Sequence, residues 1–230
     1  MALIALAGGA YAIARQTSAF AIGQLEVKGV PPDVRQQVRH VLAPLLGTNL
    51  LALDGAALER RAEALPMVVA VHYDRAFPHT LRIYVVPERP VAVLHRGSET
   101  WLVSARGRVL RRVQNGTYSS LARVWVPRKA DVAIGAFLSP AAGGTAARAL
   151  ALAQRFPAHI STASLARGEL VFRLRSGLEL RLGDPTDVRL KLAIARRALA
   201  ALPTGATYVD VSVPERPVAG VDNPQLSSRG

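Results

Sequence analysis

The sequence lacks cysteine altogether and is poor in aromatic residues. The absence of cysteine excludes disulfide bonds, thiolate zinc sites, iron–sulfur clusters and a cysteine nucleophile. Aromatic residues make up 5% of the 230 residues, and they do not alternate with the arginines as a stacking platform for single-stranded nucleic acid would require. Basic residues occur at most in pairs, as at Arg111-Arg112 and Arg196-Arg197. We therefore expect no nucleic-acid partner despite the formal net charge of +13, and interpret the charge as a basic surface facing anionic lipid or wall polymer.

Motifs for catalysis are missing as well. The five histidines show no H-E-x-x-H spacing, no G-x-S-x-G is present, and Gly143-Gly144-Thr145 lacks the frame of a phosphate-binding loop. Asp184 and Asp187 lie three residues apart, but their position between a strand and a helix favours helix capping over a carboxylate pair. We expect no enzymatic activity, no cofactor, no metal and no small-molecule substrate.

The N-terminal residues Met1–Ala14 are apolar and carry no charge. As a helix they would span about 21 Å, less than the roughly 30 Å of the hydrocarbon core. A signal peptide, a buried helix and the outer part of a membrane anchor are the alternatives, and no basic residue precedes the run as a signal peptide requires. We favour the anchor, and expect residues 1–19 to form part of a transmembrane segment.

Residues 20–90 follow a β-α-α-β-β pattern typical of one small α+β domain. Apolar residues recur at helical spacing from Val34 to Leu46, after a proline pair that suits a first helical turn. Asp54 is a candidate N-cap of a second helix that ends before Pro66. The predicted strands are Gln24–Gly29, Met67–Asp74 and Thr80–Val86.

Residues 91–214 predict a second, mixed α+β domain with an antiparallel sheet. Seven short strands are separated by Arg-Gly, Asn-Gly and Ser-Gly turns, with helices expected at about 145–155 and 187–202. An eighth and last strand is predicted at Tyr208–Val213, and the tail 215–230 is expected to be disordered.

Several segments resemble a known family when taken in order. Leu25–Gly29 is similar to the entry into a POTRA domain, and the stretches 47–54 (GTNLLALD) and 65–71 (LPMVVAV) resemble the FtsQ/DivIB cell-division proteins. The family element W/L-V-D-x-x-G-x-V has its counterpart in Trp101–Val109, with Ser104 in the aspartate position. Lys191 within a helix, followed by Tyr208–Pro214, resembles the closing helix and strand of the family. The resemblance covers residues 18–218.

This resemblance implies a single-pass type II protein of the cytoplasmic membrane, located at the division septum, with the POTRA domain and β-domain outside the cytoplasmic membrane. It implies a divisome scaffold that binds FtsB/DivIC-like and FtsL-like partners and helps regulate septal peptidoglycan synthesis. A POTRA-containing component of protein export is the alternative, since the same domain serves both classes of protein. The short, helix-containing segment after Pro90 favours the scaffold.

The last predicted strand is the candidate partner-binding site. Alternation places Tyr208, Asp210 and Ser212 on one face and three valines on the other, toward the core. A closing strand exposes an edge that can accept a partner strand through main-chain hydrogen bonds, and the resemblance implies an FtsB-like partner here. The predicted site residues are Tyr208, Val209, Asp210, Val211, Ser212, Val213 and Arg216.

Overall fold

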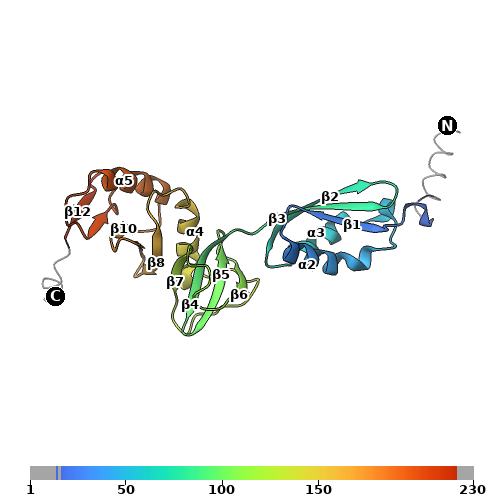
Figure 1. Cartoon of the computed structure of the whole chain (residues 1–230), viewed down its shortest axis with the longest axis horizontal. Coiled ribbons are helices and arrows are strands. Elements are labelled where there is room, and N and C mark those ends of the chain that lie inside the picture. The colour runs from blue at the N-terminus through green and yellow to red at the C-terminus, as the bar shows by residue number, and fades with distance from the viewer. Residues whose placement is uncertain (1–13, 15–16, 222–230) are drawn as a thin grey trace. The chain divides into compact units, whose positions relative to one another are not determined.

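The computed structural model describes residue 14 and residues 17–221. The chain divides into two compact units, Met1–Glu88 and Arg89–Gly230 (Figure 1). Most of the expected anchor, residues 1–13 and 15–16, lies outside the described residues, and the short turn η1 (Ser18–Phe20) follows it. Within the described part of the chain, no helix combines the length and apolar character needed to cross a membrane.

The first unit has the expected β-α-α-β-β order. Its three-stranded sheet has the order β1-β3-β2, with β1 parallel to β3 and β2 antiparallel to β3. The helices α2 and α3 are separated by two short 3-10 turns, η2 (Ala43–Leu45) and η3 (Leu50–Ala52). The main elements are β1 (Gln24–Lys28), α2 (Pro32–Leu42), α3 (Gly55–Glu63), β2 (Val68–Ala76) and β3 (Thr80–Pro87).

Helical periodicity explains how this unit packs. Val34, Val38 and Leu42 are buried along one side of α2, because residues four apart lie on the same face of a helix. The carboxylate of Asp54 accepts a hydrogen bond from the Ala57 amide at 3.0 Å, so the predicted N-cap of α3 is confirmed. These faces close a core of their own against the sheet.

The second unit contains one nine-stranded sheet of order β12-β11-β10-β9-β8-β7-β4-β5-β6. Helices α4 and α5 contribute residues to a single core with the strands, and therefore cover the same face. The elements are β4 (Pro90–Arg96), β5 (Glu99–Ser104), β6 (Val109–Arg112), β7 (Ala122–Trp125), η4 (Pro140–Gly144), α4 (Thr145–Leu152), β8 (Ile160–Ala166), β9 (Glu169–Leu174), β10 (Glu179–Gly183), α5 (Val188–Ala200), β11 (Tyr208–Asp210) and β12 (Val218–Gly220).

The prediction of an antiparallel sheet is wrong for three of the strand pairs. β4 pairs with β7, β7 with β8, and β10 with β11 in parallel. A parallel neighbour requires a crossover connection, commonly a helix, and α4 joins β7 to β8 as α5 joins β10 to β11. The sheet is therefore mixed; the helices account for two of the parallel pairs, whereas β5 and β6 form the crossover from β4 to β7.

The C-terminal part of the sheet also differs from expectation. β11 ends at Asp210 rather than Val213, and Val218–Gly220 form β12 where the sequence suggests a disordered tail. A three-residue strand between prolines and a polar tail gives almost no periodic signal. The rest of the expected tail, residues 222–230, lies outside the described residues.

Candidate partner-binding site

β11 is an interior strand, which contradicts its prediction as the exposed edge. It pairs with β10 in parallel, Val209 opposite Leu180, and with β12 in antiparallel, Val209 opposite Ala219. The chain turns after Asp210, whose carboxylate accepts a hydrogen bond from the Ser212 amide at 2.8 Å, and returns as β12. The edge that the sequence assigns to β11 therefore belongs to β12.

The side chains of the predicted site separate into three groups. Val209 and Val211 are fully buried in the core, as alternation predicts. Val213 is 52% exposed, and its carbonyl accepts a hydrogen bond from the Arg216 amide at 3.0 Å, so its expected place in the core is wrong because the strand has already ended. Tyr208 and Asp210 point to the opposite face from the valines.

That opposite face carries a ladder of charged side chains around Tyr208. The Glu179 carboxylate lies 3.2 Å from the Arg173 guanidinium and 2.9 Å from that of Arg181. The Arg181 guanidinium lies 4.3 Å from the centre of the Tyr208 ring. Register places Glu179 opposite Tyr208, and Arg181 opposite Asp210. Cations and carboxylates thus alternate on this face, with a partly buried tyrosine among them.

The outer edge of β12 is the second component of the site. The Gly220 carbonyl accepts a hydrogen bond from the Thr207 amide at 2.8 Å, so Gly220 directs its backbone groups inward. Because backbone groups alternate between the two edges of a strand, Ala219 directs its amide and carbonyl outward. No strand of the described chain pairs with that side of β12.

The opposite end of the sheet is protected differently. The Val109 amide in β6 donates to the Ala136 carbonyl at 2.9 Å, and the Gly135 amide donates to the Val109 carbonyl at 2.8 Å. A loop therefore covers the β6 edge at this point. Natural sheets cover edges in this way to prevent unwanted pairing, which leaves β12 as the more accessible end.

An ion pair that sequence reasoning missed holds α5 against the end of β10. The buried Lys191 amine donates to the Asp184 carboxylate at 2.6 Å and to the Asp184 carbonyl at 2.9 Å. Hydrogen bonds from Lys191 and then from Thr186 lower the pKa of Asp184 to about 2. The available signal is a lysine at a core position of α5, where Val188, Lys191, Leu192 and Ala195 are buried.

The predicted helix caps at this junction are wrong. The Asp187 side chain makes no capping hydrogen bond, and its backbone is left-handed with φ of 48°. Gly183, at the end of β10, also has a positive φ of 63°. A Cβ there would lie 2.6 Å from the Cβ of Ser212, so this glycine permits the chain after β11 to pack closely.

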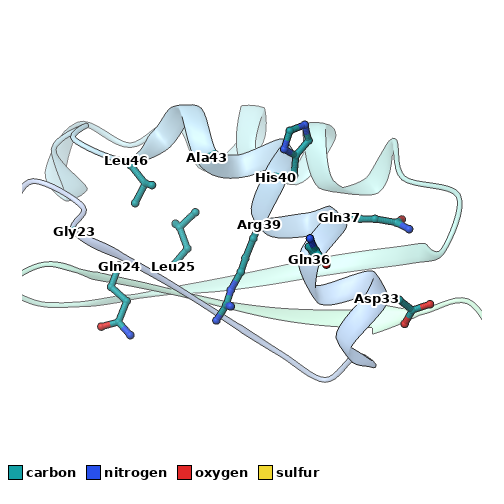
Figure 2. Close-up of a pocket in the computed structure, with 10 residues that line it drawn as sticks. All are labelled: Gly23, Gln24, Leu25, Asp33, Gln36, Gln37, Arg39, His40, Ala43 and Leu46. Atoms are coloured by element: carbon teal, nitrogen blue, oxygen red, sulfur yellow. The ribbon is translucent and has the colours of Figure 1, made fainter.

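A groove of about 890 Å³ lies in the first unit between β1 and α2. Figure 2 shows Leu25 and Leu46 facing one another at one end of it, and Arg39 extending from α2 toward β1. β1 is an edge strand of its sheet. No sequence motif distinguishes this groove, because β1 and α2 are ordinary amphipathic elements. Among the described residues no cluster of three metal-binding side chains occurs.

The fold and the strand order of the first unit identify the kind of domain it is. Residues 20–88 match the family described as POTRA domain, FtsQ-type, and this match ends where the first unit ends, at Glu88. Residues 20–88 are thus a POTRA domain of the FtsQ type.

Individual proteins of that kind are similar beyond the POTRA domain. The chain is 29% identical over 209 residues to the cell division protein FtsQ of Myxococcus fulvus, which covers 86% of this chain and 72% of that protein. FtsQ of Streptomyces venezuelae is 29% identical over 106 residues, 46% of this chain and 39% of that protein. FtsQ of Corynebacterium glutamicum is 26% identical over 87 residues, 38% and 39% of the two chains. The resemblance to the FtsQ family is confirmed, and a role in cell division is supported.

Proposed function

We propose that this protein is a scaffold of the bacterial division machinery. It binds FtsB/DivIC-like and FtsL-like partners and helps regulate septal peptidoglycan synthesis, without catalysing a reaction itself. The observation that supports this function most strongly is the similarity to the Myxococcus fulvus FtsQ, because it extends over 86% of the chain and so includes both units. The POTRA match alone would support a wider range of functions.

The proposed topology is that of a single-pass membrane protein. Residues 1–19 form part of the anchor, and both units lie outside the cytoplasmic membrane at the septum. The uncharged, apolar run Met1–Ala14 supports this topology, as does the similarity to FtsQ proteins.

The proposed partner site combines the β12 edge with the charged face around Tyr208. An extended partner segment adds to β12 through the outward backbone groups of Ala219, which is the recognition mode known as β-augmentation. Tyr208, Asp210 and Arg181 present side chains that select the partner. Ser212 and Arg216 lie in the connection between β11 and β12, whereas Val209 and Val211 contribute through the core.

Depletion of the protein in its host tests the function. Cells that lose it are expected to grow as filaments or chains, because septal synthesis fails while elongation continues, and a plasmid-borne copy should restore division. A fluorescent fusion should locate to the septum, and FtsB/DivIC-like and FtsL-like proteins should copurify with it. Normal division after a clean deletion would rule out the proposed role.

A further inference from the structure

The positive charge of the chain is concentrated in the second unit. Residues 89–230 contain 21 arginines and lysines and 9 acidic residues, a formal net charge of +12. Residues 1–88 contain 8 and 7, a net charge of +1. Such an excess of positive charge attracts anionic surfaces. The face around Tyr208 carries alternating positive and negative side chains and therefore does not account for this excess.

At the β5–β6 end of this unit, arginines and aromatic rings lie together. Phe137 is 58% exposed, and the guanidinium groups of Arg106 and Arg108 lie 5.6 and 5.9 Å from the centre of its ring. Arg111, in β6, lies 5.9 Å from the Tyr118 ring. The sequence shows no alternation of arginine with aromatic residues, because these partners come from separate segments that only the fold brings together.

The loop that carries Phe137 is held in place by backbone hydrogen bonds. Gly135 and Ala136 are hydrogen-bonded to Val109 of β6, and the Leu138 amide donates to the Gly107 carbonyl at 2.9 Å. The Arg108 Nε also donates to the Gly135 carbonyl at 2.9 Å. Ile134, in the same loop, is 55% exposed. Two large apolar side chains are thus presented to solvent by an ordered backbone, which lowers the entropic cost of binding through them.

We propose that this surface, composed of Arg106, Arg108, Arg111, Ile134 and Phe137, docks on an anionic phospholipid membrane. The guanidinium groups bind headgroup phosphates, and Ile134 and Phe137 enter the boundary between headgroups and acyl chains. Apolar side chains flanked by basic ones are the pattern of interfacial membrane binding, and each arginine near an anionic leaflet contributes about 1 kcal/mol. Two apolar side chains are too few for the core of a stable protein interface.

A single-cysteine experiment on the full chain tests this docking, since the sequence contains no cysteine. Ala136→Cys places an environment-sensitive fluorophore beside Phe137, and Ala166→Cys places one at the exposed end of β8 in the same unit. Each labelled protein is mixed with phosphatidylcholine vesicles prepared with or without phosphatidylglycerol. The fluorophore reports only on its own position, so insertion of another segment does not imitate the signal.

The expected result is a blue shift, together with quenching by spin-labelled lipid, at position 136 but not at position 166, and only with phosphatidylglycerol present. Arg106→Gln and Arg108→Gln should each weaken the response by about fivefold, and Phe137→Ser should remove the quenching, whereas Arg189→Gln on α5 is the matched control. Circular dichroism verifies that the variants fold. Equal responses at both positions, no dependence on anionic lipid, or an equal shift with soluble polyglutamate would overturn the proposal.

Discussion

Lys191 occupies a core position of α5, with its side chain 3% exposed, and its amine reaches the Asp184 carboxylate. A buried ammonium group is costly unless it is paired and hydrogen-bonded. Asp184 directly follows β10, and Lys191 lies in the first turn of α5. The pair therefore fixes the start of α5 against the end of β10. Because α5 connects β10 to β11, this single contact also influences where β11 enters the sheet.

Asp184→Asn is expected to lower the thermal midpoint of the second unit at neutral pH, because Lys191 then stays buried without a counter-charge. The folded pKa of Asp184, about 2, is below its ordinary value of 3.8. Its contribution to stability is therefore complete above pH 4 and is lost as the pH falls toward 2. Thermal melts from pH 7 to 2 should show the difference between wild type and variant shrinking over that window. Asp187→Asn is the control, and an equal loss there would contradict the account.

His95 is a second residue whose environment sets its protonation. The ring is buried in β4 and stacks on Trp125, with 4.3 Å between ring centres. Burial, and secondarily the charge of Arg123, lowers the pKa of His95 below its ordinary value of 6.5. The folded protein thus favours the neutral ring, whereas the unfolded chain takes up a proton more readily.

His95→Phe is expected to reduce the acid sensitivity of the second unit. In the wild type, the free energy of unfolding should decrease as the pH falls below 6.5, since protonation favours the unfolded chain until the folded pKa is reached. The phenylalanine keeps a ring against Trp125 but cannot titrate. Chemical denaturation at pH 7.5 and pH 5.5 measures the difference, with His72→Phe on the exposed face of β2 as control. An unchanged pH dependence in His95→Phe would refute this assignment.

At the scale of elements, local signals predicted most of the fold. The apolar faces of α2, α3 and α5, and the alternation within β3, are properties of contiguous residues and could be predicted directly. Strand order could not, because pairing of β10 with β11, or of β4 with β7, joins residues far apart in the chain. The same limitation placed the partner edge on β11, since β12 is a three-residue strand whose identity depends on its neighbour rather than on its own pattern.

The ends of the nine-stranded sheet illustrate this dependence. Whether an edge is accessible is decided by what folds over it, as the loop containing Ala136 does at β6. The Asp184–Lys191 pair could not be predicted for a similar reason. Helical periodicity places Lys191 among the apolar residues of α5 but does not indicate its partner. The proposed site therefore keeps the region of the chain that the sequence indicated, but its edge strand is β12 rather than β11.

At the scale of the whole molecule, each unit has a core of its own. Leu58 is fully buried in the first and Phe172 in the second. Because each unit has its own core, we expect the two units to unfold separately.

Leu58→Ala is expected to cost the first unit about 2–5 kcal/mol, and Phe172→Ala the second unit about 3–5 kcal/mol, because each removes packed side-chain volume. Hydrogen exchange followed by mass spectrometry localises the loss of protection. Each variant should weaken protection within its own unit, on either side of the boundary at Glu88 and Arg89. Loss of protection spread equally over both units would show that they unfold together.

The central claim is that a division partner adds a strand to β12, and the backbone of Ala219 tests it most directly. Ala219→Pro removes the outward amide without touching the inward hydrogen bonds to β11, and proline is tolerated on an edge strand whose amide faces solvent. Ala219→Ser keeps the amide and changes the side chain by one hydroxyl. The measurement is the affinity of each variant for the FtsB-like partner, with thermal melts to verify the fold. The account predicts about tenfold or greater loss for Ala219→Pro and near-normal binding for Ala219→Ser; normal binding by a folded Ala219→Pro variant would contradict it.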